Sequence, residues 1–129
     1  RCPRRYAWCP RITPTRQRTI NHMKNNVLIA FSTCADRAQG RILAEDMVQS
    51  GLAACVNLVP NLTSVYRWQG QIQSDDECLM IIKTSEGSIS ALREWILKRH
   101  PYELPELVAV RVADGLPAYL QWVTDQIRR

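Results

Sequence analysis

The sequence lacks the long apolar runs and the short catalytic motifs that assign many chains to a class at once. No apolar stretch approaches the roughly 18–20 residues of a membrane-spanning helix, so we expect no membrane span. G-x-S-x-G, H-E-x-x-H and the phosphate-binding P-loop are all missing, which excludes the enzymes built on them. With 129 residues, 46% of them hydrophobic, the chain is long enough for one domain with a substantial core.

The five cysteines lack the spacing of a redox or zinc motif. They stand at positions 2, 9, 34, 55 and 78, and no two of them form a C-x-x-C. Cys55 and Cys78 lie in apolar runs, where we expect small buried hydrophobic side chains. An odd number of cysteines without such pairing is typical of a reducing compartment, so we expect a cytoplasmic protein.

Acidic residues are absent from residues 1–22, which hold six of the 17 Lys and Arg residues. The rest of the chain carries 11 basic against 12 acidic residues, so the net charge of +5 comes from one short segment. The chain from Met23 onward therefore has no electrostatic basis for binding nucleic acid. We expect residues 1–22 to be a disordered basic extension, either upstream of a natural start at Met23 or a targeting arm, and residues 23–129 to be the folded domain.

The folded part begins with the pattern of a strand followed by a helix. Residues 27–31 are a short apolar run suited to a buried strand. Thr33 and Asp36 have the [ST]-x-x-[DE] spacing of a capping box, and Gly51 is a natural end for the helix that follows. We expect the apolar face of this helix to comprise Ala38, Ile42, Met47 and Val48.

A long hairpin is predicted next. Residues 52–59 and 63–68 favour one strand that bends or bulges at Pro60-Asn61. Gln69-Gly70-Gln71 predicts a tight turn, and the return strand has its core at residues 79–84. A hairpin of this length exposes strand edges that another chain can pair with.

The second half predicts a helix, a strand and a last helix. Residues 86–99 have helical spacing, and Pro101 should end that helix at His100, because proline disfavours helical backbone in the residue before it. Residues 107–112 predict a strand, and Pro117 suits the first turn of a helix. The apolar stripe of this last helix is expected to comprise Leu116, Leu120, Val123 and Ile127.

The predicted order is β-α-β-β-α-β plus one helix. This is the α+β ferredoxin-like sandwich, with two helices on one face of an antiparallel sheet. Only the last helix is left to cover the other face, which favours self-association.

The stretch HPYELPE at residues 100–106 combines an imidazole, a phenol and two carboxylates. Its two prolines make it stiff, so it loses less entropy on binding than a Gly/Ser loop would. We interpret it as either a binding element or a stiff connector between the helix and the next strand.

Five motifs stand in the order and spacing of the CutA family: LAACVN at 52–57, YRWQG at 66–70, IKT at 82–84, HPYELPE at 100–106 and YLQW at 119–122. Over about residues 26–128 the chain therefore resembles this divalent-cation tolerance family. The resemblance implies a ferredoxin-like subunit and a very stable homotrimer in which the hairpin pairs across subunits. It also implies an association with copper and other divalent metal ions.

His100 is the leading metal candidate, because a neutral imidazole binds copper well. Glu103 and Glu106 would add oxygen ligands, and Cys55 would add a soft sulfur. The alternative places His100 at a helix C-terminus and Cys55 in the core. The resemblance implies copper ligands at the positions of Ser32 and Arg99, so the set found in the family is incomplete here.

The resemblance also places five residues around a cleft between subunits, where a small anion or metabolite would bind. The alternative is that the aromatic residues among them anchor the interface and that Lys83 and Glu106 form a structural ion pair. The five residues are Tyr66, Trp68, Lys83, Tyr102 and Glu106.

We expect a non-enzymatic homotrimer whose partners are divalent metal ions, copper among them, and copies of itself. A metabolite-sensing or scaffold trimer that binds an anion in the cleft is the alternative. Acylphosphatases share the topology, and such an enzyme would need Arg37 or Arg41 in an anion-binding turn. A nucleophile–base pair of Cys55 and His100 would also require the fold to bring these residues together.

Overall fold

The computed structural model describes residues 25–127. The predicted α+β order of β-α-β-β-α-β plus a C-terminal helix is confirmed. The expected basic extension, residues 1–22, lies outside the described residues. The elements are β1 (Val27–Cys34), α1 (Arg37–Gln49), β2 (Cys55–Trp68), β3 (Gln71–Ser85), α2 (Ile89–Arg99), β4 (Val108–Arg111) and α3 (Pro117–Gln126).

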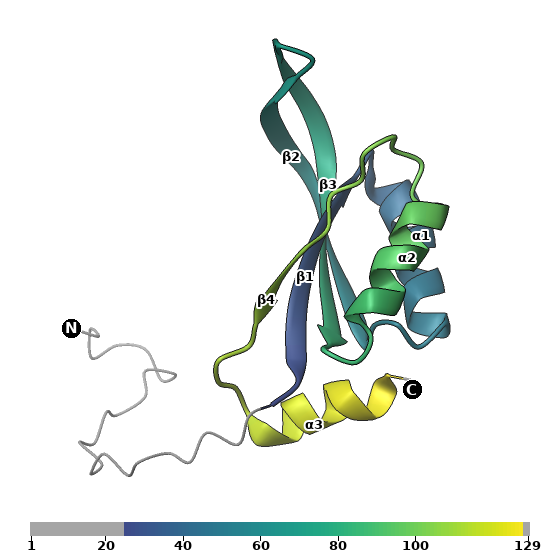
Figure 1. Ribbon diagram of the computed structural model, residues 1–129, viewed down its shortest axis with the longest axis vertical. Coiled ribbons are helices and arrows are strands. Elements are labelled where there is room, and N and C mark those ends of the chain that lie inside the picture. Colours follow the sequence, from purple (N-terminus) through teal and green to yellow (C-terminus); the bar gives the residue numbers. More distant parts are fainter. Residues whose placement is uncertain (1–24, 128–129) are drawn as a thin grey trace, which may run out of the picture.

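The four strands form one antiparallel sheet in the order β2-β3-β1-β4. Strand β1 is central and pairs with β3 along its full length, from Val27 opposite Ser85 to Cys34 opposite Cys78. Helices α1 and α2 lie together against one face of the sheet, and the β2–β3 hairpin extends past the sheet at the end opposite α3 (Figure 1). Strands β2 and β4 are the edges of this sheet.

The hairpin has the bend and the turn that the sequence predicts. The β2–β3 register shifts between Val59 and Leu62, and Asn61 has φ of 62°. This is the bulge expected at Pro60-Asn61. The turn consists of Gln69 and Gly70, both with positive φ, as in the two-residue turns that match the twist of paired strands.

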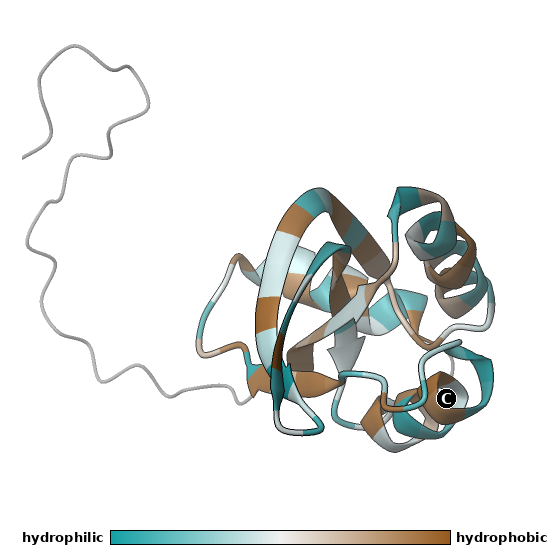
Figure 2. Cartoon of the chain, turned by 90° about the horizontal axis from the view of Figure 1, so that it is seen from above, coloured by the Kyte–Doolittle hydropathy of each residue, from teal (hydrophilic) through white to brown (hydrophobic). Residues whose placement is uncertain are grey.

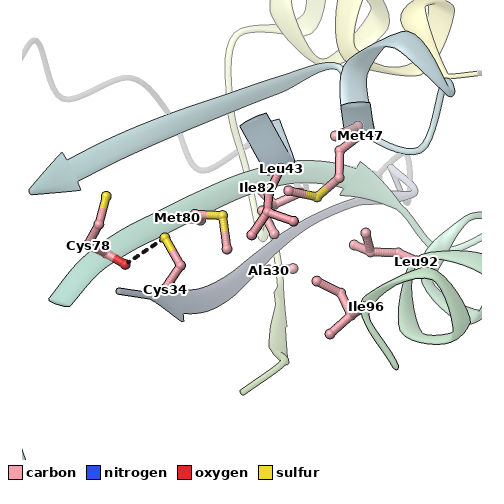
Figure 3. Close-up of a cluster of buried hydrophobic side chains, with 10 residues drawn as sticks. Ala30, Cys34, Leu43, Met47, Cys78, Met80, Ile82, Leu92 and Ile96 are labelled. Carbon is pink, nitrogen blue, oxygen red and sulfur yellow. Dashed lines mark hydrogen bonds between the residues drawn. The ribbon is translucent and has the colours of Figure 1, made fainter. Parts of the chain in front are cut away.

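The main core lies between the sheet and the helices α1 and α2. Apolar and polar residues alternate along the strands and around the helices (Figure 2). The side chains of Cys34, Met47, Cys78 and Met80 put four sulfur atoms into this core (Figure 3). Its buried members are Ala30, Cys34, Leu43, Met47, Ala53, Cys78, Met80, Ile82, Leu92 and Ile96.

The capping box predicted at Thr33 is wrong. Strand β1 continues through Cys34, so Thr33 is still in the sheet and the helix begins later. Asp36 is the actual N-cap, and its carboxylate accepts a hydrogen bond from the Gln39 backbone N–H at 2.8 Å. The Gln39 side chain in turn accepts from the Ala35 N–H at 3.0 Å, one residue before the N-cap, so the arrangement is close to a capping box three residues further on.

The face of α1 that packs on the sheet also differs from the predicted one. Of the predicted residues, Met47 is buried, whereas Ala38, Ile42 and Val48 are exposed, Ile42 to 70%. The face that packs on the sheet instead comprises Gly40, Leu43, Ala44 and Met47.

The sheet face away from α1 and α2 is only partly covered, and we call it the open face. Helix α3 covers one end of it, where Val123 packs with Val27 and Ala54. Leu120 and Ile127 flank this contact as predicted, but Leu116 lies at the helix N-cap and is exposed. Elsewhere on the open face, Val59, Val108 and Val110 remain largely exposed.

Replacing Asp36 by Ala removes the carboxylate that caps α1. We expect the free energy of unfolding to fall by about 1 kcal/mol, the usual cost of losing an N-cap. Urea unfolding followed by circular dichroism at one fixed protein concentration measures the change. Glu94→Ala on the exposed surface of α2 is the control and should change stability by less than about 0.5 kcal/mol. Equal stabilities of the two variants would contradict a capping role for Asp36.

Candidate functional site

His100 ends α2 and fastens the following loop to the sheet. Its backbone leaves the helical region, with φ of −74° and ψ of 134°, as Pro101 requires. The ring Nε2 lies 2.8 Å from the Thr33 carbonyl oxygen, and Nδ1 accepts from the Tyr102 N–H at 3.1 Å. Since a carbonyl only accepts and an N–H only donates, the neutral ring carries its proton on Nε2. Neither nitrogen has a free lone pair for a metal ion in this arrangement.

A second contact holds the other end of the loop. The Ser32 hydroxyl donates to the Glu106 carbonyl oxygen at 2.7 Å. Together with the His100–Thr33 contact, this bond ties both ends of the HPYELPE segment to β1. The stiff loop expected from its prolines is thus anchored at both ends, and its carboxylates have a defined position relative to the hairpin.

Between this loop and the hairpin lies an open cavity of about 860 Å³. Five carboxylates line it, against one cationic side chain, Arg67. Tyr66, Trp68, Tyr102, Glu103 and Glu106, all candidates from the sequence, take part in the lining. The residues that line the cavity are Thr33, Ala35, Ser64, Val65, Tyr66, Arg67, Trp68, Asp75, Asp76, Glu77, Tyr102, Glu103, Leu104 and Glu106.

Two phenols donate to acidic residues of β3 at the cavity. The Tyr66 hydroxyl donates to Asp75, and the Tyr102 hydroxyl donates to Glu77 at 2.8 Å. The hydrogen bond to Asp75 raises the pKa of Tyr66, whereas burial and then the bond to Glu77 raise the pKa of Tyr102. Both phenols therefore remain protonated donors at neutral pH.

Glu106 is affected both by its burial and by a neighbouring carboxylate. Partial burial, followed by repulsion from the Glu77 carboxylate, raises the pKa of Glu106. A cation in the cavity would stabilise the ionised form of Glu106, because its positive charge would offset both effects. The site is therefore suited to cations and unfavourable for small anions.

Lys83, the expected partner of an anion, is not among the residues that line the cavity. Its Nζ donates to Asn57 Oδ1 at 2.6 Å, lies 3.8 Å from Cys55 Sγ and is 5.8 Å from the centre of the Tyr119 ring. Cys55 is likewise absent from the lining. Of the five residues expected around the cleft, four line this cavity and the fifth, Lys83, lies beside α3.

The residues named for an enzyme are not arranged for catalysis within residues 25–127. Arg41 binds Glu45 on the same helix at 3.2 Å. The N-terminus of α1, where an anion-binding turn would lie, is capped by the carboxylate of Asp36. Cys55 contacts Lys83, while both nitrogens of His100 are bonded elsewhere, so the two do not form a nucleophile–base pair.

The ligand set of a tight metal site is also missing from the described region. No group of three or more His, Cys, Asp or Glu side chains is arranged there to hold an ion. Ser32 is engaged by the Glu106 carbonyl, and Arg99 lies 3.8 Å from Asp46. The copper ligands implied by the family resemblance therefore do not fit the residues at these positions.

Sequence reasoning missed the acidic run Asp75-Asp76-Glu77. The run was recognisable in the sequence, because three adjacent acidic residues in one strand repel one another unless hydrogen-bond donors or cations lie nearby. Their register shows the arrangement, with Asp76 opposite Thr63 and Asp75 opposite Ser64.

None of the helices between residues 25 and 127 is long and apolar enough to cross a membrane.

Comparison with protein families gives one match over nearly the whole described region. The model for the family "CutA1 divalent ion tolerance protein" matches residues 28–126. This description names tolerance to an ion rather than a chemical reaction.

Individual relatives agree with that family. The chain is 43% identical to mouse "Protein CutA" over 102 residues, which are 79% of this chain and 58% of the mouse protein. It is 42% identical to the "Divalent-cation tolerance protein CutA" of Thermus thermophilus over 97 residues, 75% of this chain and 94% of that protein. It is 41% identical over 101 residues to "Protein CutA, chloroplastic" of Arabidopsis thaliana, covering 78% of this chain and 56% of that protein.

Solved structures show the same fold. CutA from Xylella fastidiosa superimposes with a TM-score of 0.77 at 42% identity, covering 80% of this chain and 99% of that one. CutA1 from Oryza sativa gives a TM-score of 0.78 at 37% identity, covering 81% and 96%. The chain thus spans these solved chains almost completely but somewhat over half of the mouse protein.

The raised pKa of Glu106 predicts a pH-dependent effect of Glu106→Gln. Because the pKa is higher in the folded state, ionising Glu106 costs stability, and this cost grows as pH rises above about 4.3, the ordinary pKa of glutamate. Glutamine avoids the cost, so the variant should have a higher Tm than the parent at pH 7 and an equal Tm near pH 4. Glu94→Gln on α2 is the control and should show no such difference between the two pH values. A Glu106→Gln effect of the same size at both pH values would contradict the raised pKa of Glu106.

Proposed function

The chain belongs to the CutA1 divalent ion tolerance family, and on that basis we propose that it is a non-enzymatic protein that binds divalent cations as a homotrimer in the cytoplasm. The cation is cargo, bound and released, rather than a resident cofactor. The observation that supports this most directly is the cavity, where five carboxylates meet one arginine. Copper is the proposed physiological ion, because Cu(II) has the highest affinity in the divalent series.

We assign binding to the carboxylates rather than to a histidine–cysteine set. Glu77 and Glu106 repel each other, so a cation between the hairpin and the loop would relieve a cost that the folded chain already carries. Glu103 and Asp75 line the same cavity and add negative charge there, although the carboxylates between residues 25 and 127 are not drawn together as a closed ligand set. His100 becomes a ligand only if its ring releases Thr33 or Tyr102, and its proposed role is to position the loop.

Calorimetric titration with Mn(II) and Cu(II) tests the assignment, since Mn(II) prefers oxygen ligands. The double variant Glu77→Gln/Glu106→Gln should bind Mn(II) at least about tenfold more weakly than the parent, equivalent to about 1.4 kcal/mol. Glu45→Gln/Glu94→Gln removes the same charge from exposed helix positions and should bind like the parent. Equal affinities of the two double variants, or no Mn(II) binding to the parent, would contradict a carboxylate site.

His100→Ala separates a positioning role from direct ligation. If His100 only anchors the loop, the variant should bind Mn(II) and Cu(II) more weakly by a similar factor. Selective loss of Cu(II) binding would instead identify the imidazole as a ligand, the role predicted for it from the sequence.

The open face supports the homotrimer. Val108 and Val110 lie on it, because they pair with Phe31 and Ile29 while Ala30 and Ser32 point toward the helices. Val59 is exposed on the same face. An apolar sheet face between two edge strands costs free energy in water, and pairing with other copies covers both the face and the edges.

Val110→Asp tests the trimer. We expect the parent to sediment at three times the mass of one chain and the variant to lose this species, because a buried unpaired carboxylate strongly disfavours association. Val48→Asp is the matched control, since Val48 is similarly exposed, 44% against 52%, but lies on α1 in the opposite layer. Sedimentation of the parent at the mass of one chain would rule out the trimer, and dissociation of both variants would place the interface elsewhere.

A further inference from the structure

Two cysteines face each other across the central strands of the sheet. Cys34 is the last residue of β1, and its direct partner in β3 is Cys78. Both have 0% of their surface exposed, and neither is in a disulfide. The apolar run around Cys78 predicts a packing residue, and its pairing with Cys34 follows only from the register.

The two sulfur atoms converge on one point beneath α1. A β-carbon added to Gly40 would lie 3.1 Å from Cys34 Sγ and 3.4 Å from Cys78 Sγ. Cys34 Sγ makes two weak backbone contacts, one to Asp36 O at 3.4 Å and one to Cys78 O at 3.7 Å, which Figure 3 shows. Cys78 Sγ makes only a weak contact to Leu79 O at 3.9 Å, so neither thiol has a strong hydrogen-bond partner.

The surroundings of this pair select a kind of ligand. The thioether side chains of Met80 and Met47 belong to the same buried cluster, so the chemistry around the pair is that of soft sulfur. No third or fourth nitrogen or oxygen ligand completes a group with the two cysteines in residues 25–127. Zinc prefers four ligands and hard cations prefer oxygen, so this pair suits neither. A soft ion that needs only two sulfur ligands is suited to this buried site.

The acidic cavity lies close to the pair but on the other face of the sheet. Thr33 and Ala35, the neighbours of Cys34 in sequence, line that cavity, and so does Glu77, the neighbour of Cys78. Because side chains alternate between the two faces of a strand, the two sulfurs are on the helix side, and the carboxylates act on an ion at this pair only through their negative charge.

We propose that Cys34 and Cys78 form a two-sulfur site for a soft metal ion of the Cu(I) type. On binding, two S–H bonds break, two metal–sulfur bonds form, and two protons leave to solvent, with no change of oxidation state. Burial, and then the neighbouring Cys78, raise the pKa of the Cys34 thiol to about 12, so this thiol keeps its proton in the metal-free chain. The site uses none of the carboxylates proposed above for divalent cations, and it stands if that proposal fails.

The test uses the full chain carrying Cys2→Ser and Cys9→Ser, which removes the thiols outside the described region. Under anaerobic, reducing conditions we expect one Cu(I) per chain to be retained against a colorimetric Cu(I) chelator, with Ag(I) behaving alike. Cys34→Ala and Cys78→Ala should each lose this retention, and Cys55→Ala should keep it, since Cys55 lies beside Lys83. Circular dichroism confirms that the variants are folded.

X-ray absorption on the metal-loaded parent provides a readout that needs no variant. Two equivalent sulfur neighbours around Cu(I) would support the site. Coordination by nitrogen or oxygen, retention unchanged in Cys34→Ala, or loss in Cys55→Ala alone would overturn it. So would a parent that retains no Cu(I) and instead forms a Cys34–Cys78 disulfide under mild peroxide, detected as a mass lower by two hydrogens.

Discussion

The pairing of β1 with β3 is the constraint on which the rest of the structure depends. This eight-residue register, from Val27 opposite Ser85 to Cys34 opposite Cys78, decides which side chains face the helices. It places the Thr33 carbonyl where His100 reaches it and the Ser32 hydroxyl where it holds Glu106. A slip of one residue would invert both faces and separate every contact that orients the loop. The candidate site is therefore a product of the central strands, although most of its charges lie in the hairpin and the loop.

Features encoded by neighbouring residues could be predicted from the sequence. The bulge at Pro60-Asn61, the turn at Gln69-Gly70 and the end of α2 at His100 each depend on the backbone preferences of one or two residues. The start of α1 could not be predicted in the same way, because Thr33 fits a capping box equally well and only pairing with β3 keeps it in the strand. The position of Lys83 was inaccessible for a similar reason, since Asn57 and Tyr119 approach it from distant parts of the chain.

The acidic cavity shows how a stiff scaffold maintains an unfavourable distribution of charge. Asp75, Asp76 and Glu77 are held in β3, and Glu103 and Glu106 are held by an anchored loop. In this arrangement, burial and then repulsion from Glu77 raise the pKa of Glu106 in the folded state. Tyr66 and Tyr102 offset part of this repulsion by donating hydrogen bonds to Asp75 and Glu77. Charge crowding of this kind is typical of binding sites and is rare on surfaces that only need to be soluble.

The open edges of the sheet have a consequence for how the protein is made. The central register joins residues as far apart as Val27 and Ser85, so the sheet closes only after a long stretch of chain has been synthesised. Such non-local pairing is slow, and loop closure must occur before the contacts can offset its entropy. Meanwhile β4, which completes the sheet, arrives last among the strands with its valines exposed. The nascent chain thus passes through a period in which its edges are competent to join any neighbour, and its yield on refolding should depend on protein concentration.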